Sequence, residues 1–434
     1  MYKRWSPVLA VGLILPVLSG CGLASITRDR LLVWHDWPEA EAAVLTELLT
    51  SYEELDPDLE LIVEYVPPGE IEARFVDEVK SGFGPDVLIG ADAAALPALV
   101  DDGAVHDITP RQTVRYGFDD LDGRALSAMS VDDAQSGVPL AAFTDVLYHR
   151  DGVEPPESLA DVLDLASDGH SVAIPLDFFD AYWGVDAFDG RVFGRENVIA
   201  PDSGFTEWMR WLVRARRNPN VILDGEYDVL RDLFAAGKID VFVGGSRELG
   251  TFRSVLVETG SGSSSAGDDP TGETDGDEAD DAVIDASTPT LTNVGDPTFG
   301  VATLPGGSKD DPGGFLDVEG MVINQHTDSL AGALALMEYL TNVPSQGRIA
   351  RAGVGRIPVN PSVSIDATTS PMEAALVVQQ RHAIAMPQIV QSRQAELSAV
   401  ANDVYLEVTR GLLEPADAAT ELRDRFDEHL ESAD

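Results

Sequence analysis

Two short stretches of the sequence bring aromatic rings and carboxyl groups close together. Residues 35–38 read HDWP, and residues 177–184 read DFFDAYWG, the richest aromatic cluster in the chain. Aromatic faces stack on the apolar CH faces of sugar rings, while planar polar groups bond hydroxyls. Both stretches are therefore suited to hold a polyhydroxylated small molecule.

Neither stretch belongs to a catalytic motif, and the common motifs are absent from the sequence. It contains no Gly-x-Ser-x-Gly, no His-Glu-x-x-His and no phosphate-binding loop. The single cysteine, Cys21, cannot form an intramolecular disulfide, and one ligand does not make a metal site. We expect no enzymatic activity, no cofactor and no metal. A glycoside hydrolase stays as the enzymatic alternative, since 75 acidic residues leave room for an opposed pair of carboxylates.

The elements around the first stretch alternate between strand and helix. Short apolar runs at 30–35, 59–66 and 85–91 predict buried strands. Between them lie amphipathic stretches with apolar residues at helical spacing, the first of which opens at Pro38. Such alternation predicts a parallel sheet with right-handed crossovers, which is an α/β fold.

The position of HDWP in this pattern decides what its side chains face. The stretch follows the first strand at its carboxyl end, where open α/β sheets bind their ligands. We therefore expect His35, Asp36 and Trp37 to face a cleft. In the alternative interpretation, Asp36 caps the following helix and Trp37 packs against it as a hydrophobic staple.

The alternation resumes in the middle of the chain and ends in helices. The strand pattern continues around 137–150, 170–176 and 239–245, ordered structure returns at 299–307, and a further strand is predicted at 316–325. The C-terminal third is expected to be helical, with Pro415 in the first turn of the last helix.

One long segment interrupts the pattern. Residues 259–293 are rich in Gly, Ser, Thr and Asp and contain no aromatic residue and no cation. Such a composition cannot bury enough apolar area to offset the entropy of ordering, so we predict a disordered surface insertion. An acidic metal-binding loop is the alternative, although its carboxylates lack the spacing of a calcium loop.

The N-terminus has the features of a secreted, lipid-anchored protein. A basic pair precedes an apolar run over residues 5–20, and the sequence LSG before Cys21 resembles the lipobox of secreted lipoproteins. The run is shorter than the roughly 20 residues that a spanning helix needs, and two prolines interrupt it. We predict a signal peptide at 1–20, lipidation of Cys21 and a tether at 21–29, which places the chain on the extracellular face of the cell membrane.

The composition is globular but unusually acidic. About 410 residues remain after the leader, enough for two domains. Against 75 acidic residues stand 29 Lys and Arg, of which four are lysines, for a net charge of -46. Such a surface repels nucleic acid, and its self-repulsion is screened only at high salt. The pattern resembles adaptation to extreme halophily of the haloarchaeal kind, the alternative being an acidic protein of an ordinary organism.

Five stretches, in this order, resemble the extracellular solute-binding proteins of the maltose/maltodextrin type. They are LLVWHDW, SGFGPDVLIGADAAALPALVDDGAVHDIT, GVPLAAFTDVLYHRD, LRDLFAAGKIDVFVGGS and ALALMEYLTNVPSQGRIARAGVGRIPVNPSV. The resemblance implies a two-lobed periplasmic-binding-protein type II (Venus flytrap) fold whose discontinuous lobes are joined by crossover strands. Lobe 1 would comprise 30–141 plus 307–354, and lobe 2 would comprise 142–306 plus 355–434.

The resemblance also indicates which side chains face the ligand. Asp92 lies in a loop that carries polar ligand contacts in the family, although the family's cleft tryptophan aligns with Gly90 here. In the 177–184 stretch the family places a stacking aromatic and an acid, which makes Asp180, Tyr182 and Trp183 candidates. We expect at least one of these aromatics to belong to the core instead.

Four further candidates complete the set. Phe143, in the crossover, faces either the cleft or the hinge core. Arg247 aligns with another stacking tryptophan of the maltose type, and it is suited to bond sugar hydroxyls or an anionic ligand. Its alternative is a surface ion pair with Glu248 or a neighbouring residue. Glu319, after the returning strand, and Arg393, in the helix after AMPQ, are the remaining candidates.

The function that the resemblance implies is solute capture for an ABC importer. The chain would bind a sugar or oligosaccharide between its lobes, as a monomer, and deliver it to a membrane permease. The alternatives are a binding protein for an anionic molecule of the glycerol phosphate or uronate type, and a surface sensor lipoprotein without a transport role.

The charge generates the first testable prediction. We expect cooperative unfolding, followed by circular dichroism, when KCl or NaCl is dialysed below about the molar range, because the screening length then grows beyond about 3 Å. A folded spectrum that persists at millimolar salt would contradict the halophilic interpretation.

Overall fold

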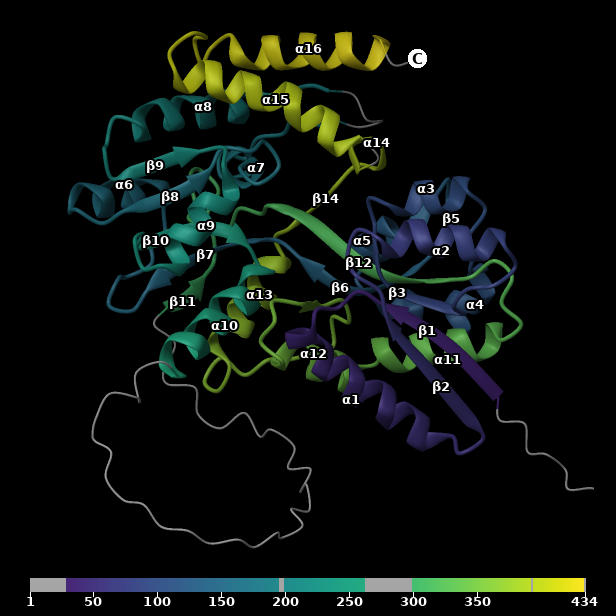
Figure 1. Cartoon of the computed structure of the whole chain (residues 1–434). Helices are drawn as coiled ribbons and strands as arrows, with labels where there is room; N and C mark the ends of the chain where they lie inside the picture. The colour runs from purple at the N-terminus through teal and green to yellow at the C-terminus, as the bar shows by residue number, and fades with distance from the viewer. Residues whose placement is uncertain (1–28, 195–198, 262–298, 392, 433–434) are drawn as a thin grey trace, which may run out of the picture.

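The computed structural model describes residues 29–194, 199–261, 299–391 and 393–432. The predicted signal peptide, Cys21 and nearly all of the predicted tether and acidic insertion lie outside these residues. Within the described part, the chain forms two α/β lobes, each built around its own sheet (Figure 1). The α/β class predicted from the alternation is thus confirmed.

The first sheet has seven strands in the order β13-β6-β12-β3-β1-β2, with β14 beside β12. The strands are β1 (Asp29–His35), β2 (Leu59–Tyr65), β3 (Val87–Asp92), β6 (Val138–Phe143), β12 (Phe315–Ile323), β13 (Ile357–Pro358) and β14 (Ile384–Ala385). Strand β1 runs parallel to β2 and β3, whereas β12 runs antiparallel to β3 and β6. The carboxyl ends of β1 and β3 therefore meet the first half of β12 at one edge.

The second sheet has five strands in the order β11-β7-β10-β8-β9. They are β7 (Asp145–Arg150), β8 (Val172–Pro175), β9 (Val221–Asp224), β10 (Val241–Gly245) and β11 (Phe299–Ala302). Strands β8, β9 and β10 are parallel, and β7 runs antiparallel to β10. The beginning of β7 consequently lies at the same edge as the carboxyl ends of β8 and β10. A separate short hairpin joins β4 (Ser130–Val131) and β5 (Ala134–Gln135).

Helices cover the faces of both sheets. Those around the first sheet are α1 (Glu39–Leu55), α2 (Ile71–Lys80), α3 (Leu96–Asp101), α4 (Pro110–Arg115), α5 (Gly123–Ala128), α11 (Leu330–Thr341) and α12 (Val343–Arg351), with the 3-10 turn η1 (Phe118–Asp120). Those around the second sheet are α6 (Leu159–Ser167), α7 (Tyr182–Asp186), α8 (Ser203–Ala215), α9 (Tyr227–Ala235) and α10 (Glu248–Ser261). The C-terminal third adds α13 (Pro371–Gln380), α14 (Gln388–Gln391), α15 (Gln394–Thr409) and α16 (Ala418–Ser432), of which α15 and α16 pack with α8 at one end of the molecule (Figure 1).

The two sheets are joined most directly through a single residue. The predicted strand at 137–150 forms two strands, because β6 ends at Phe143 and β7 begins at Asp145, with Thr144 between them. The two strands belong to different sheets. The chain returns from β11 in the second sheet to β12 in the first, and β13 then pairs with β6. The exact limits proposed for the two lobes stay a prediction.

Two apolar cores hold the lobes. One lies under the first sheet and continues onto the second, where Tyr148, Phe242 and Phe252 form an aromatic group, with the rings of Tyr148 and Phe252 edge to face at 4.9 Å. The other core lies between the second sheet and α8, α15 and α16, and includes Trp208 and Tyr405. Because the first core crosses from one sheet to the other, the lobes share a packed junction.

The C-terminal helices differ in detail from the sequence prediction. The last helix, α16, begins at Ala418, so Pro415 lies in the turn before it rather than in its first turn. Leu422 and Phe426 are buried, as expected. The first three residues of the predicted insertion, 259–261, belong to α10. No helix in the described ranges combines the length and the apolar character needed to cross a bilayer.

Candidate functional site

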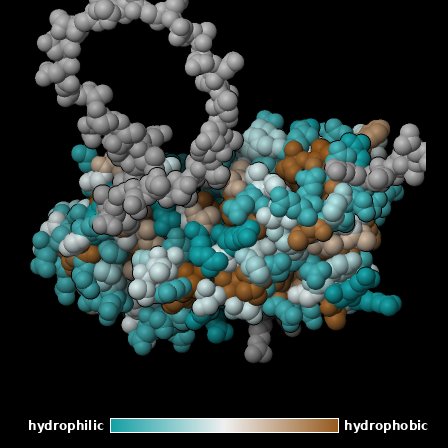
Figure 2. Space-filling view, turned by 90° about the horizontal axis from the view of Figure 1, so that it is seen from below, coloured by the Kyte–Doolittle hydropathy of each residue, from teal (hydrophilic) through white to brown (hydrophobic). Residues whose placement is uncertain are grey.

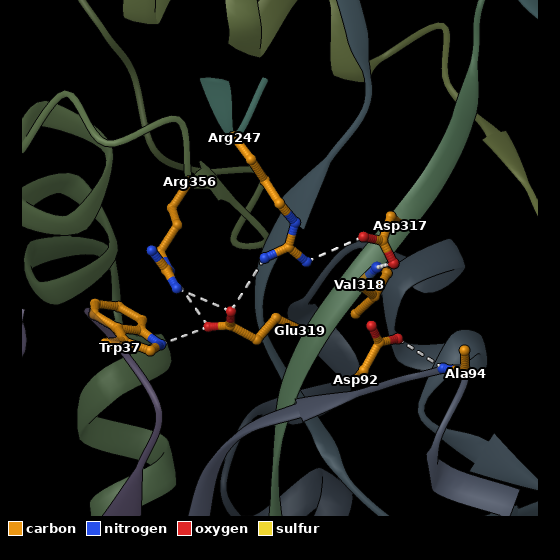
Figure 3. Close-up of polar contacts among 8 residues, drawn as sticks. All are labelled: Trp37, Asp92, Ala94, Arg247, Asp317, Val318, Glu319 and Arg356. Carbon is orange, nitrogen blue, oxygen red and sulfur yellow. Dashed lines mark hydrogen bonds and ion pairs between the residues drawn. The ribbon is translucent and has the colours of Figure 1, made fainter. Parts of the chain in front are cut away.

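The candidate site lies where loops of both lobes converge on β12 (Figure 3). The carboxyl ends of β1 and β3 deliver Asp36, Trp37 and Asp92 to this edge of the first sheet. Glu319, in β12, is paired directly with Asp92 across the strands. Arg247 reaches the same place from the loop after β10 in the second lobe. Five predicted site residues that are far apart in the sequence are thus brought together.

The carboxylate of Glu319 is the centre of the cluster. It is 4% exposed and accepts a hydrogen bond from the Trp37 indole Nε1 at 2.6 Å. The guanidinium of Arg356 binds it through two nitrogens, at 3.3 Å from Nε and 2.9 Å from Nη2. Arg247 forms an ion pair with it at 3.5 Å from Nη1. A buried carboxylate is costly unless it is paired in this way.

Arg356 is a central residue that the sequence analysis missed. It is 5% exposed, its guanidinium lies 3.8 Å from the centre of the Trp37 ring, and it also pairs with Glu41 at the start of α1. Its position depends on the preceding Gly355, whose φ is +80°. A Cβ at Gly355 would lie 1.9 Å from the carbonyl oxygen of Ser246, so a side chain there would collide with the loop after β10.

Arg247 joins the two lobes. Its Nη2 donates to the Asp317 carboxylate in β12 at 3.0 Å, and its guanidinium lies 3.4 Å from the centre of the Phe143 ring. The alternative partner considered for it, Glu248, is not among its ion-pair partners in the described residues. Phe143 is 3% exposed, so it packs at the hinge with one face against this arginine.

Burial is the main cause of the shifted pKa values on the first-lobe side of the site. It raises the pKa of Asp36 and of Asp92 to about 6, and that of Glu319 to about 7. Burial also lowers the pKa of Arg356 to about 9. Nearby arginines oppose the shifts of the three acids, but they do not cancel them. The site therefore holds carboxyl groups that exchange protons near neutral pH.

The carboxylate of Asp36 occupies the space beside Gly90. This glycine lies in β3 with φ +104°, and a Cβ placed on it would be 2.0 Å from Asp36 Oδ1. A side chain at this position would have to displace the Asp36 carboxylate. The neighbouring His35 packs its ring against Tyr65 at 5.7 Å between ring centres, away from the cluster around Glu319.

The second lobe contributes its own acids to the same edge. Asp145 opens β7 and is 9% exposed, and Asp180 lies in the loop between β8 and α7. Burial, reinforced by the nearby Asp180, raises the pKa of Asp145 well above its usual value. Burial and Asp177 raise the pKa of Asp180 to about 7. Asp145 is the second functional candidate that the sequence analysis did not single out.

A cavity of about 550 Å³ lies between the lobes beside this edge. Ala94, whose amide binds Asp92 at 2.8 Å, lines it from the first lobe. The other lining residues belong to the second lobe: Asp177, Phe179, Gln391, Arg393, Gln394, Ala395, Glu396 and Ser398. Figure 2 shows hydrophilic and hydrophobic residues mixed over the face that it views.

Two polar groups of this cavity are held in place. The carboxylate of Asp177 accepts from Ser398 Oγ at 2.5 Å and from Asn402 Nδ2 at 2.7 Å. Arg393, a predicted site residue, lines the cavity and pairs with Glu396 at 3.1 Å. The cavity thus has a fixed acceptor and a paired cation.

None of the predicted site aromatics lines the cavity, and the two in the 177–184 stretch belong to the core. Trp183 is fully buried in the second-lobe core, where its ring packs against Trp208 at 5.3 Å. Tyr182 is 3% exposed, lies 4.2 Å from the ring of Phe315, and its hydroxyl accepts from the Val192 amide. These two rings serve packing, and among the aromatics of that stretch Phe179 is the one that lines the cavity.

Within the described ranges, no group of three acidic, histidine or cysteine side chains is placed to hold a metal ion. On the first-lobe side, Glu319 is bound by arginines and an indole and Asp92 by a backbone amide. Such an arrangement offers many hydrogen-bond acceptors.

A sequence profile described as bacterial extracellular solute-binding protein matches residues 47–375. No curated protein matches the sequence. Solved structures of similar fold include the maltose-binding protein MalE of Listeria monocytogenes in complex with maltose, with a TM-score of 0.71 and 18% identity over 93% of this chain and 98% of that one.

Two further structures are similar to the same extent. The cyclic alpha-maltosyl-1,6-maltose binding protein of Arthrobacter globiformis has a TM-score of 0.70 at 16% identity, over 93% of this chain and 99% of that one. The sugar-binding protein MalE of Xanthomonas citri has a TM-score of 0.68 at 18% identity, over 93% of this chain and 98% of that one. At these identities the likeness shows the fold, which is the two-lobed type II periplasmic-binding fold.

The raised pKa values predict that acidification stabilises the site. Because the folded pKa of Asp92 lies above its unfolded value of about 4, the unfolded chain binds fewer protons between pH 4 and 6, and stability falls as pH rises through that window. We expect Asp92→Asn to raise stability at pH 7 by about 1–3 kcal/mol and to leave it unchanged at pH 4. Thermal unfolding at the two pH values, in constant high salt, measures both effects.

The matched control is Asp119→Asn, which removes one acidic charge from an exposed position. It should change the melting temperature much less, since an exposed charge is screened by salt. A loss of stability in Asp92→Asn at pH 7 would contradict the prediction, because it would mean that the charged form is favoured in the folded state.

Proposed function

Because this chain belongs to the bacterial extracellular solute-binding protein family, we propose that it binds a sugar or oligosaccharide between its two lobes and delivers it to an ABC permease. The observation that carries the proposal is the cavity of about 550 Å³ lined from both lobes. A cavity of this size suits a small ligand, and a ligand that touches both lobes stabilises the closed state.

The polar groups favour a neutral polyol over an anion. Arg356 is bound to Glu319 and Glu41, and Arg247 is bound to Asp317 and Glu319. An anionic ligand would have to displace these carboxylates and would then face Asp92 and the other acids of the site. Carboxylates readily accept hydrogen bonds from sugar hydroxyls. A glycerol phosphate or a uronate is therefore the less suitable ligand.

The structural relatives support the same choice. The proteins named above bind maltose or a cyclic maltosyl sugar, or are described as sugar-binding. Those statements hold for the relatives, and here they add to the argument from the site. In this chain Phe179 is the aromatic residue that lines the cavity.

Lobe closure would be the signal that the permease reads. We propose that the two lobes move as bodies about the junction at Thr144. The strands β13 and β14 lie within the 355–434 segment predicted for lobe 2, but they belong to the first sheet and would move with it. Arg247 crosses this junction to β12, so its contacts change when the lobes move. A hinge of few residues between packed lobes is the usual device for such closure.

The test is a ligand screen in high salt with a shape readout. We expect isothermal titration with maltose, maltotriose and maltotetraose to reveal binding, and glycerol 3-phosphate and glucuronate to bind much more weakly. Bound sugar should reduce the radius of gyration in small-angle scattering and should be recovered unhydrolysed by chromatography. Binding of the anions alone would overturn the proposal.

Two tryptophan variants connect this binding to the site. Trp37→Phe keeps a ring but removes the donor to Glu319, and we expect sugar affinity to fall about tenfold because the cleft edge loses part of its preorganisation. The matched control is Trp34→Phe, three residues away. The indole nitrogen of Trp34 is buried without a partner in the described residues, and Arg74 covers its ring outside the site. Equal effects of the two variants would contradict the role of Trp37.

We further propose that Cys21 carries a lipid and holds the chain on the outer face of the cell membrane, as a monomer. The support is the position of the only cysteine after the apolar N-terminal run. Cys21→Ser should release the protein into the medium or leave the leader uncleaved, as seen by cell fractionation and mass spectrometry. A variant that stays on the membrane with its leader removed would show that the proposal is wrong.

A further inference from the structure

The second-lobe wall of the cavity contains two consecutive phenylalanines with different surroundings. Phe178 is fully buried in the core, where its ring lies edge to face with that of Tyr405 at 5.9 Å between ring centres. Phe179 lines the cavity and is 5% exposed. Because the two side chains are identical, their chemistry does not decide which ring is presented to a ligand. The backbone of the loop between β8 and α7 decides it.

Asn402 holds this loop with both ends of its side-chain amide. It lies in α15 and is not one of the residues that line the cavity. Its Oδ1 accepts from the Phe178 amide at 2.7 Å, and its Nδ2 donates to the Asp177 carboxylate at 2.7 Å. A side chain that bonds a backbone amide and the preceding carboxylate at once restricts both the position and the rotation of the peptide unit between them.

The carboxylate of Asp177 extends this network to the next residue. Its Oδ1 accepts from the Phe179 amide at 2.9 Å, while its Oδ2 accepts from Asn402 and from Ser398 Oγ. Asn402 also donates to Ser398 Oγ at 3.1 Å. Ser398 and Asn402 are four residues apart in α15 and therefore lie on one face of the helix. These bonds connect the amides of Phe178 and Phe179 to a single helix face.

The carboxylate of Asp177 is used mainly to hold the loop. A carboxylate has about four acceptor positions, and three donors of the protein already bind this one. Asp177, Ser398 and Asn402 are all half-buried, so water competes for these bonds less than it does at an exposed site. Hydrogen bonds to a charged group are also stronger than those between neutral groups. The loop is therefore fixed before a ligand enters.

We propose that Asn402 is a positioning residue for ligand binding: it sets the place of the Phe179 ring in the cavity wall, and this ring then stacks on a sugar of the ligand. The inference rests on the proposed function, because it names a residue that prepares the same cavity for the same class of ligand. Asn402 acts through the loop and does not touch the ligand. A binding surface that is already fixed loses less conformational entropy on binding.

The test is a double-mutant cycle with maltose, maltotriose and maltotetraose, titrated calorimetrically in molar KCl. Asn402→Ala should weaken sugar binding about tenfold, because the Phe179 ring is no longer held. Phe179→Ala should weaken it at least as much. In the double variant the loss should stay within about twofold of that of Phe179→Ala alone, since a residue that acts through the ring then has nothing left to position.

A matched control separates this role from a general loss of packing. Asn220 is a half-buried asparagine of the same lobe, and its Nδ2 donates to the carbonyl oxygen of Ala166 at 2.8 Å. Neither of these residues lines the cavity. Asn220→Ala should lower the melting temperature and keep sugar affinity within about twofold of wild type. Equal losses of affinity in Asn220→Ala and Asn402→Ala would show that the positioning role is wrong.

A swap of two side chains keeps the test decisive if Asn402→Ala does not fold. Asp177→Asn combined with Asn402→Asp exchanges the amide and the carboxylate across the same contact, and the amides of Phe178 and Phe179 keep their acceptors. The Ser398 hydroxyl turns to donate to the relocated carboxylate. Asn402→Asp alone should weaken sugar binding about tenfold by placing two carboxylates together, and the swap should recover affinity to within about threefold of wild type. Unchanged binding in Asn402→Asp, or a folded swap variant that binds as weakly, would overturn the inference.

The failure of this inference differs from that of the proposed function. If wild type binds sugar and the losses of Asn402→Ala and Phe179→Ala multiply in the double variant, the positioning role is wrong and the proposed function stands. If wild type binds none of the three sugars, both are wrong.

Discussion

The pairing of the buried Glu319 carboxylate is the interaction on which the site depends. The carboxylate binds an indole from the first lobe, an arginine from the return segment and an arginine from the second lobe. Each of these donors lies on a different connection between the strands. Burying such a charge is tolerable only while its partners are present, so the hydrogen bonds fix three loops relative to β12. The cleft edge is thereby organised before any ligand arrives.

Much of this arrangement could be predicted from local patterns. Apolar runs and helical spacing located the strands and the main helices, and the rule that ligands meet the carboxyl ends of parallel strands led to Asp36, Trp37 and Asp92. These predictions succeed because each needs only the residues within one helix or strand and a single rule of sheet topology. The short strands β13 and β14 have two residues each, which is too few for a periodicity.

Residues whose role depends on distant partners could not be found in this way. Arg356 follows a glycine in an apolar segment, and such an arginine stands out only because this chain has few cations. Its partner Glu319 lies 37 residues earlier, so no local pattern connects the two. Asp145 looks like one acid among many, because its burial at the start of β7 is a three-dimensional property. Trp183 was misplaced for the same reason: aromatic content suggests stacking, but the short helix α7 turns this ring toward Trp208.

The close approach of Asp36 to Gly90 constrains how the binding preference of this protein can change during evolution. A single substitution of Gly90 by a larger residue would meet the Asp36 carboxylate and would also strain a backbone with positive φ. Shortening Asp36 alone would remove an acid and leave an empty space. The two positions are coupled, because the room beside Gly90 depends on the side chain at Asp36. In a lineage that carries this pair, an aromatic residue on β3 is therefore difficult to acquire. Changes of binding preference are expected to arise more readily from substitutions in the second lobe.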